Sequence, residues 1–207
     1  MKHFTSSDFE SMSRFYRANL INSVSGYKPA NLIGTVDEAG HTNLAIFSSV
    51  VHLGADPALL GFIQRPITAF SHTYQNILAT GYYTINHVHR SFAENAHYTS
   101  ARFDRSISEF EACKLTPEWI APFKAPFVRE SQIKIGMKFL QEMPIELNNT
   151  RLIIGQIEHL IVPEEWVAAD GNIALDQAED MCISGLETWY MAQKVAQYPY
   201  AKVPQKN

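Results

Sequence analysis

A mainly β fold, a small β-barrel with peripheral helices, is predicted by the distribution of apolar residues along this 207-residue chain. Apolar segments of strand length recur between turn residues, and several of them carry apolar residues on both faces. Strands of a barrel that is covered by helices on its outside show this pattern. The predicted strands are residues 31–36, 43–52, 58–64, 81–88, 132–140 and 151–162.

The remaining elements follow from capping and turn signals. Ser7-Asp-Phe-Glu10 fits a capping box, and Phe9 and Met12 begin a helical spacing, so an amphipathic helix is predicted at about residues 8–22. Turns are predicted at 38–40, 56–57 and 170–171, short helices at 70–79 and 91–98, a loop-rich insertion at 101–126, a last helical segment at 186–196 and an extended tail at about 197–207.

No internal repeat, low-complexity tract or linker divides the chain, so residues 1–207 are expected to form a single domain. A hydrophobic fraction of 46% with 18% charged residues is ordinary for a globular protein with a real core. The net charge of −4 and the lack of any long Lys/Arg cluster argue against nucleic acid as a partner.

Targeting and membrane signals are missing from the sequence. The first residues contain acids and no long apolar stretch, unlike a secretory signal. The longest apolar runs have strand length and fall below the roughly 20 residues of a membrane span. We therefore expect a cytoplasmic protein without a membrane partner. Cys113 and Cys182 are expected to be free thiols, with a disulfide or redox pair as the alternative.

Several catalytic signatures are excluded. The two closest glycines, Gly34 and Gly40, are six positions apart, which rules out the dinucleotide fingerprint and the Walker phosphate loop. The chain has no G-x-S-x-G, H-E-x-x-H or C-x-x-C motif. No side chain is therefore predicted to be catalytic, and the absence of a nucleophile or metal cage favours an enzyme that leaves its chemistry to a cofactor.

The segment 43–76 has the composition of a ligand site. Small and hydroxyl residues lie on one predicted strand, and Arg65 ends the next strand before a helix start that contains Ser71, His72 and Thr73. A helix N-terminus offers free N–H groups and the positive end of the dipole. This layout suits a phosphate-bearing aromatic ligand that lies against a sheet edge. The alternative for Arg65 is a charge that reaches into solvent at a strand end.

The same segment carries a family resemblance. The order Asn-Leu-Ala-x-Phe-Ser, Asp-Pro, Arg-Pro, His-Thr-x-x-Asn-Ile and Gly81-Tyr-Tyr-Thr-Ile-Asn86 resembles the flavin reductase-like group of FMN-binding split barrels. The likeness continues through Ser108-Glu-Phe110, Ala125-Pro126, the strand from Leu152 to Ile157 and the Gly185-to-Tyr190 element. It covers roughly residues 20 to 190.

The resemblance implies an FMN-binding split barrel that works as a homodimer and reduces flavin with NADH or NADPH, hydride entering at flavin N5. FAD is a possible second flavin. Where His72 stands, many members have Asp or Lys, so the role of His72 is open. The implied cofactor-binding residues are Asn43, Ala45, Ile46, Phe47, Ser48, Ser49, Gln64, Arg65, Pro66, Ser71, His72, Thr73, Asn76, Ser100 and Phe103.

Alternatives remain at the level of function and of single residues. The protein could be an FMN electron carrier or sensor without nicotinamide turnover, or a haem-binding barrel, which would require an axial histidine in a broad apolar pocket. His87 and His89 lie two apart on a predicted strand and thus on one face, but without a clear third ligand no metal site is predicted. Tyr190 could line the pocket or pack in the barrel.

Overall fold

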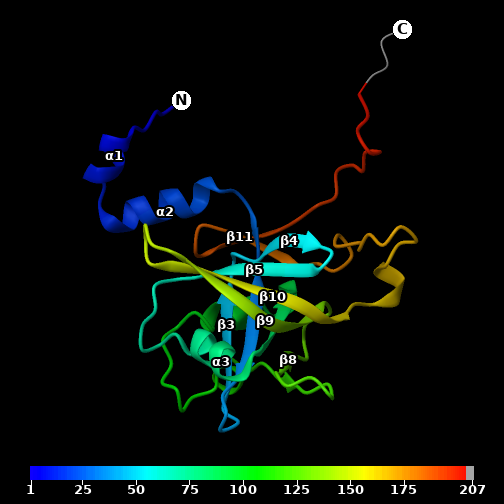
Figure 1. The fold of residues 1–207 in the computed structure, drawn as a ribbon. Helices are drawn as coiled ribbons and strands as arrows, with labels where there is room; N and C mark the ends of the chain where they lie inside the picture. Colours follow the sequence, from blue (N-terminus) through cyan, green and yellow to red (C-terminus); the bar gives the residue numbers. More distant parts are fainter. Residues whose placement is uncertain (204–207) are drawn as a thin grey trace.

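The computed structural model of the chain describes residues 1–203. Its centre is a seven-stranded antiparallel sheet in the order β3-β2-β6-β9-β10-β5-β4 (Figure 1). The mainly β prediction is confirmed. The strands of this sheet are β2 (Asn31–Val36), β3 (Thr42–Phe47), β4 (Val51–Ala55), β5 (Ala58–Gln64), β6 (Tyr82–His87), β9 (Lys134–Ile145) and β10 (Thr150–Ile161).

The connection between β3 and β4 shows why the sheet curls. These two strands are the opposite edges of the sheet, yet only residues 48–50 separate them in sequence. Four consecutive Cα–Cα steps reach at most about 14 Å. The edges must therefore meet at this corner, which closes the barrel at one end. Among residues 1–203, no strand pairs with the outer side of β3.

The barrel interior is filled by one apolar cluster. Phe62, Tyr83, Met137 and Ile153 are fully buried in it, and Ile77 adds the inner face of helix α3 (His72–Thr80). Each such side chain contributes about 1.5–3 kcal/mol by leaving water. A Cβ at Gly155 would collide with the Tyr83 hydroxyl, so this strand position has to be glycine.

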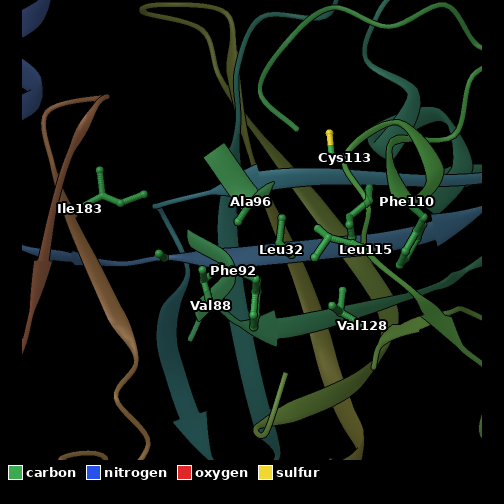
Figure 2. Close-up of a cluster of buried hydrophobic side chains, with 11 residues drawn as sticks. Leu32, Val88, Phe92, Ala96, Phe110, Cys113, Leu115, Val128 and Ile183 are labelled. Atoms are coloured by element: carbon green, nitrogen blue, oxygen red, sulfur yellow. The ribbon is translucent and has the colours of Figure 1, made fainter. Parts of the chain in front are cut away.

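A second apolar cluster lies on the outer face of β2 and β3 (Figure 2). Leu32 and Leu44 form its floor, and Phe92, Ala96 and Phe110 cover them from three short elements. Ile183 joins the cluster from the C-terminal hairpin, on the left in Figure 2. The covering elements are η1 (Arg90–Phe92), α4 (Ala93–Tyr98), α5 (Glu109–Ala112) and β11 (Met181–Ser184).

The single N-terminal helix predicted for residues 8–22 is wrong in detail. The structure has two helices, α1 (Ser6–Ser11) and α2 (Arg14–Val24). They are separated by Met12, which is extended, and by Ser13, the N-cap residue of α2. The capping residue is Thr5, whose N–H donates to the Asp8 carboxylate at 2.6 Å. Neither helix buries a residue, and both lie at the periphery of the fold (Figure 1).

The predicted strand 43–52 is also two elements. β3 ends at Phe47, a bend follows at Ser48 and Ser49, and β4 begins at Val51. The Ser49 hydroxyl accepts the Ile63 N–H at 3.1 Å and donates to the Ile63 carbonyl at 3.3 Å. The Ser49 hydroxyl thus satisfies both backbone groups of Ile63 on β5 in place of a partner strand. The pairing between β4 and β5 ends here, and the chain bends between β3 and β4.

The helix predicted for residues 186–196 is wrong. Residues Thr188–Met191 form β12, which pairs with β11 in a hairpin, and β11 pairs with β1 (Lys28–Pro29). Gly185 makes the connecting turn with a φ of 70°, a conformation that favours glycine. Residues 192–203 have no regular structure and run away from the barrel (Figure 1), and residues 204–207 of the predicted tail lie outside the described residues.

Other local predictions are confirmed. The turns at 38–39, 56–57 and 169–170 are present, and the short helical segments appear as α3 and as η1 followed by α4. The insertion 101–126 is mostly irregular, with α5 and the short strand β7 (Pro117–Glu118), which pairs with β8 (Phe127–Val128). A further 3-10 turn, η2 (Glu164–Trp166), follows β10. Cys113 and Cys182 are free thiols and form no disulfide with each other. Within residues 1–203, no helix has the length and apolar character needed to cross a membrane.

Candidate functional site

The outer edge of β3 presents backbone groups at Ile46. The Leu44 N–H points away from β2, because it donates to Glu109 Oε2 at 2.9 Å. On the neighbouring strand β2, Leu32 lies opposite Ile46. The Leu32 carbonyl accepts a hydrogen bond from the side-chain amide of Asn86 on β6 at 3.1 Å, so this carbonyl faces β6 and not β3. Since backbone groups alternate in direction along an antiparallel strand, the N–H and C=O of Ile46 face outward.

The loop that precedes α5 holds this edge in place. The hydroxyls of Thr42 and Ser108 are 2.7 Å apart, and Glu109 bonds to Leu44 two residues further along the strand. Glu109 is buried, with 5% of its surface exposed, and burial raises the pKa of its carboxyl group although the Leu44 N–H favours the ionised form. Together the two contacts fix the start of β3 against the loop.

Helix α3 begins beside β3 with its first N–H groups uncapped. Ser71 is the N-cap residue but makes no side-chain bond to the helix. Its hydroxyl instead accepts the Thr68 N–H at 3.0 Å. The first N–H groups of a helix have no partner inside it, so those of His72 and Thr73 stay available. Such a terminus attracts an anion.

Polar side chains connect the start of α3 to the barrel. The Asn43 amide donates to the Thr73 hydroxyl at 2.9 Å, and the Asn76 amide donates to the Thr35 hydroxyl at 3.2 Å. All four side chains are buried. Asn43 and Thr73 are therefore brought together, and the Thr73 hydroxyl keeps its own proton for donation to another group.

Arg105 fastens the loop to the same helix. Its guanidinium group donates to Gln75 Oε1 at 2.7 Å, to Asn76 Oδ1 at 3.1 Å and to Asp37 Oδ2 at 3.3 Å. Burial first, and then the charge of Arg105, lower the pKa of His72, which favours the neutral imidazole. The cavity between these side chains measures about 10 Å³, which holds one water molecule and no larger ligand.

The other residues named from the sequence lie around this edge. Arg65 and Pro66 are exposed in the connection from β5 to α3, and Gln64 is buried with its amide donating to the Arg65 carbonyl at 3.1 Å. Ser100 donates to the carbonyl of His97 at 2.7 Å, and Phe103 packs against the outer apolar cluster that Ile46 also contacts.

Two residues that hold the site together were missed by sequence reasoning. Arg105 and Glu109 stand in a loop-rich insertion, where a charged residue is normally solvated. The pattern Ser108-Glu-Phe110, with an acid directly before a buried aromatic residue, is the one signal that could have indicated a buried carboxylate at Glu109. No local pattern marks Arg105, because its partners lie about 30 and 68 positions away.

His87, the last residue of β6, and His89, which precedes η1, each contact a carboxylate. His87 Nδ1 lies 2.7 Å from Asp180, and His89 Nε2 lies 3.3 Å from Glu179, which also pairs with Arg90 at 2.7 Å. These contacts fasten the segment before β11 to the barrel. Within residues 1–203, no cluster of three or more potential ligands could hold a metal ion.

The fold is shared with known structures. A split-barrel protein from Shewanella frigidimarina NCIMB 400, which carries the name of a flavin reductase, is 47% identical, with a TM-score of 0.94 over 97% of this chain and 100% of that chain. Nitrilotriacetate monooxygenase component B from Bacillus cereus (18% identity, TM-score 0.82, 96% and 98% of the two chains) has the same fold. So does 2-nitrobenzoate 2-nitroreductase NbaA from Pseudomonas fluorescens (19%, 0.82, 99% and 99%).

The family of this chain is identified by a match between its sequence and a family model. Residues 26–182 match the model of the flavin reductase like domain, a range that contains β2 to β10, α3 and the whole edge of β3. The resemblance inferred from the segment 43–76 is thereby confirmed, and the chain belongs to the flavin reductase-like family of FMN-binding split barrels.

Proposed function

We propose that the chain binds FMN along the outer edge of β3 and reduces it with NADH or NADPH. The observation that carries the proposal is the pairing of two unsatisfied backbone features: the outward-facing groups of Ile46 and the uncapped start of α3. The first suits the hydrogen-bonding edge of an isoalloxazine ring, and the second suits a phosphate. The family typically binds FMN.

Each group of residues has a distinct task in this proposal. The amides of His72 and Thr73, the Ser71 hydroxyl and the exposed guanidinium group of Arg65 hold the phosphate. The outward-facing N–H and C=O of Ile46, which lies between Ala45 and Phe47, orient the ring, with Ser48 and Ser49 at the bend beside it. Asn43, Gln64 and Asn76 support these elements, and Ser100 and Phe103 lie along the α4 side. When bound, FMN supplies a hydride acceptor at its N5 atom.

A homodimer is part of the proposal. Helix α2 buries no residue, and Phe15 and Val24 on it are 80% and 75% exposed. Leu147, at the turn between β9 and β10, is 98% exposed, and Leu140 and Met143 on β9 are about half exposed. Apolar side chains in such number are normally covered, and a second copy of the chain with twofold symmetry is the simplest cover.

The haem alternative is disfavoured by the surroundings of the buried histidine. Among residues 1–203, His72 is the one buried histidine, with 8% of its surface exposed, and polar side chains and a cavity for one water surround it. An axial haem ligand would need a broad apolar pocket. The carrier or sensor alternative differs from a reductase in rate alone, so kinetics distinguishes the two.

Anaerobic mixing of the FMN-loaded protein with NADH or NADPH tests the proposal. We expect the visible absorbance of oxidised flavin to disappear faster than it does for free FMN at the same concentrations. Bleaching at the rate of free FMN, with flavin still bound, would overturn the reductase assignment and leave the carrier or sensor. A protein that does not bind FMN at all would overturn both.

A further inference from the structure

An open cleft lies between α4 and the C-terminal hairpin. It measures about 310 Å³ and is lined by Ala93, Glu94, His97 and Tyr98 from α4 and by Glu187 and Trp189 from the hairpin. This volume falls at the lower end of the range of small-molecule pockets, about 300–1,000 Å³. None of the residues named for the flavin lines it, so the cleft is distinct from the proposed flavin site.

The walls of the cleft are aromatic and held in place. The ring of His97 meets Trp189 at 6.3 Å between centroids and Tyr98 at 5.8 Å, both edge-on. Trp189 is partly buried because it also packs against the outer apolar cluster. The pairing of β12 with β11 fixes its backbone opposite Ile183. A segment that docked here would therefore meet a positioned indole ring.

The charge of the cleft is negative. Glu94 and Glu187 are exposed, one from α4 and one from the hairpin, and the six described lining residues include no Lys or Arg. A cation beside an aromatic face also gains from the ring quadrupole, for which Trp is the best partner. The lining therefore suits an occupant that combines aromatic or apolar groups with a positive charge.

The chain itself contains a segment of that composition. The C-terminal arm, residues 192–203, follows β12 and includes Lys194 and Lys202 but no Asp or Glu. All of its residues are exposed, and its large apolar and aromatic side chains are at least 86% exposed: Val195, Tyr198, Tyr200 and Val203. Such a concentration of exposed apolar side chains marks an interaction site.

The outer half of the arm has a preset extended form. Pro199 restricts its own φ angle and biases the preceding residue, Tyr198, toward extended conformations. Side chains two positions apart in an extended chain lie on the same side, so Tyr198, Tyr200 and Lys202 share one face. An extended segment that is preset by proline loses little conformational entropy when it docks in an aromatic-lined groove.

The arm is better placed for the cleft of a second copy than for its own. It leaves the barrel directly after Met191, two residues beyond Trp189, and runs away from the fold (Figure 1). To return to its own cleft it would have to turn back within a few residues. Residues 192–197 contain no Gly, Pro, Asn, Asp or Ser, the residues on which tight turns depend. The sequence of the arm therefore favours a reach outward to another chain.

We propose that the C-terminal arm of a second copy of the chain docks in this cleft, with Tyr200 against Trp189 and Lys202 close to Glu94 and Glu187. The inference rests on the homodimer of the proposed function and adds a contact that α2 does not supply. In a dimer with twofold symmetry the exchange is reciprocal, so both arms and both clefts are occupied. The contact covers the aromatic residues of the arm and pairs its charge.

Chemical cross-linking in the full chain tests where the arm lies. The variant Glu94→Cys/Ala201→Cys places one thiol on α4 at the cleft and one between Tyr200 and Lys202. A short bis-maleimide should join these thiols between two chains and give a covalent species of twice the chain mass of 23.4 kDa. The controls are each single substitution and Glu38→Cys/Ala201→Cys, whose first thiol lies in the turn between β2 and β3. They should give little of this species.

A charge exchange tests the recognition. Lys202→Glu, added to the doubly substituted chain, should lower the yield of linked dimer severalfold, because the arm then meets Glu187 with the same sign. Glu187→Lys together with Lys202→Glu should restore the yield. Lys124→Glu, an exposed change outside both the arm and the cleft, should leave it unchanged.

Three results would overturn the inference. A link between the two introduced thiols within one chain, seen as a product of single-chain mass, would place the arm in its own cleft. Absence of the linked species, although light scattering shows the variant to be a dimer, would leave the homodimer standing without this contact. A monomer in light scattering would overturn the homodimer and the inference together.

Discussion

Glu109 and Leu44 are 65 positions apart in sequence, and the Leu44 N–H donates to the Glu109 carboxylate at 2.9 Å. Leu44 lies on the outer edge of β3, where a neighbouring strand would otherwise supply the acceptor. The side chain of Glu109 takes the place of that strand at one residue and leaves the next outward-facing residue, Ile46, open. The buried carboxylate of Glu109 thus satisfies the outer edge of β3 at Leu44, and the ligand is proposed to bind at Ile46.

Substitutions at Glu109 test this role. Glu109→Ala should lower the free energy of unfolding by about 1–3 kcal/mol, because the Leu44 N–H loses its acceptor in a buried environment. Glu109→Gln keeps a carbonyl oxygen and should recover most of that loss. Urea unfolding followed by circular dichroism measures both. Equal destabilisation by the two substitutions would contradict a role through the hydrogen bond.

The pH dependence of stability should carry the signature of Glu109. Burial raises its pKa above the ordinary value of 4.5, so the folded chain holds the proton more tightly than the unfolded chain does. The stability of the native protein relative to Glu109→Gln is therefore greatest below pH 4.5 and should decrease as the pH rises through the raised pKa. Urea unfolding of both proteins from pH 4 to pH 8 measures the difference. A difference that grows with pH would contradict the assignment.

Arg65 should contribute to FMN affinity through the phosphate. Arg65→Ala should weaken FMN binding by roughly 1.5–3 kcal/mol, the scale of a hydrogen bond to a charged group. Riboflavin lacks the phosphate and should bind the variant and the native protein equally. Arg129→Ala, an exposed arginine in the turn after β8, is the matched control and should not change FMN affinity. Fluorescence titrations that show unchanged FMN affinity for Arg65→Ala would remove Arg65 from the site.

The exposed apolar side chains of α2 should be buried in the contact between the two chains of a dimer. Light scattering at micromolar concentration should give twice the chain mass of 23.4 kDa. Phe15→Glu should shift the mass toward that of one chain, because the charge would be buried in the contact. A monomer that still binds FMN as tightly would contradict the proposed assembly.

Much of the barrel could be predicted because its strands carry local signals. Residues 31–36, 58–64 and 81–88 are apolar runs bounded by turn residues, and each matches an observed strand within about one residue. The bend at Ser48 and Ser49 could not be predicted, because the bond that makes it joins Ser49 to Ile63 on another strand. Local sequence does not show such a partner.

The C-terminal error has a similar cause. Residues 186–196 contain Glu, Ala, Gln and Lys, which favour a helix, whereas the observed β12 depends on pairing with β11. Tertiary pairing outweighs local propensity there. For the proposed site, residue types and the family resemblance indicate the segment 43–76, which stays a prediction. The residues that hold it, Arg105 and Glu109, are defined by contacts that only the folded chain creates.

Residue-resolved hydrogen exchange with and without FMN tests the central claim most directly. If the ligand lies along β3 with its phosphate on α3, the amides of Ile46, His72 and Thr73 should exchange more slowly when FMN is bound. The amides of Asn43, Ala45 and Phe47, which face β2, should change little and serve as internal controls. FMN binding that protects other segments and leaves Ile46 and the start of α3 unchanged would contradict the account.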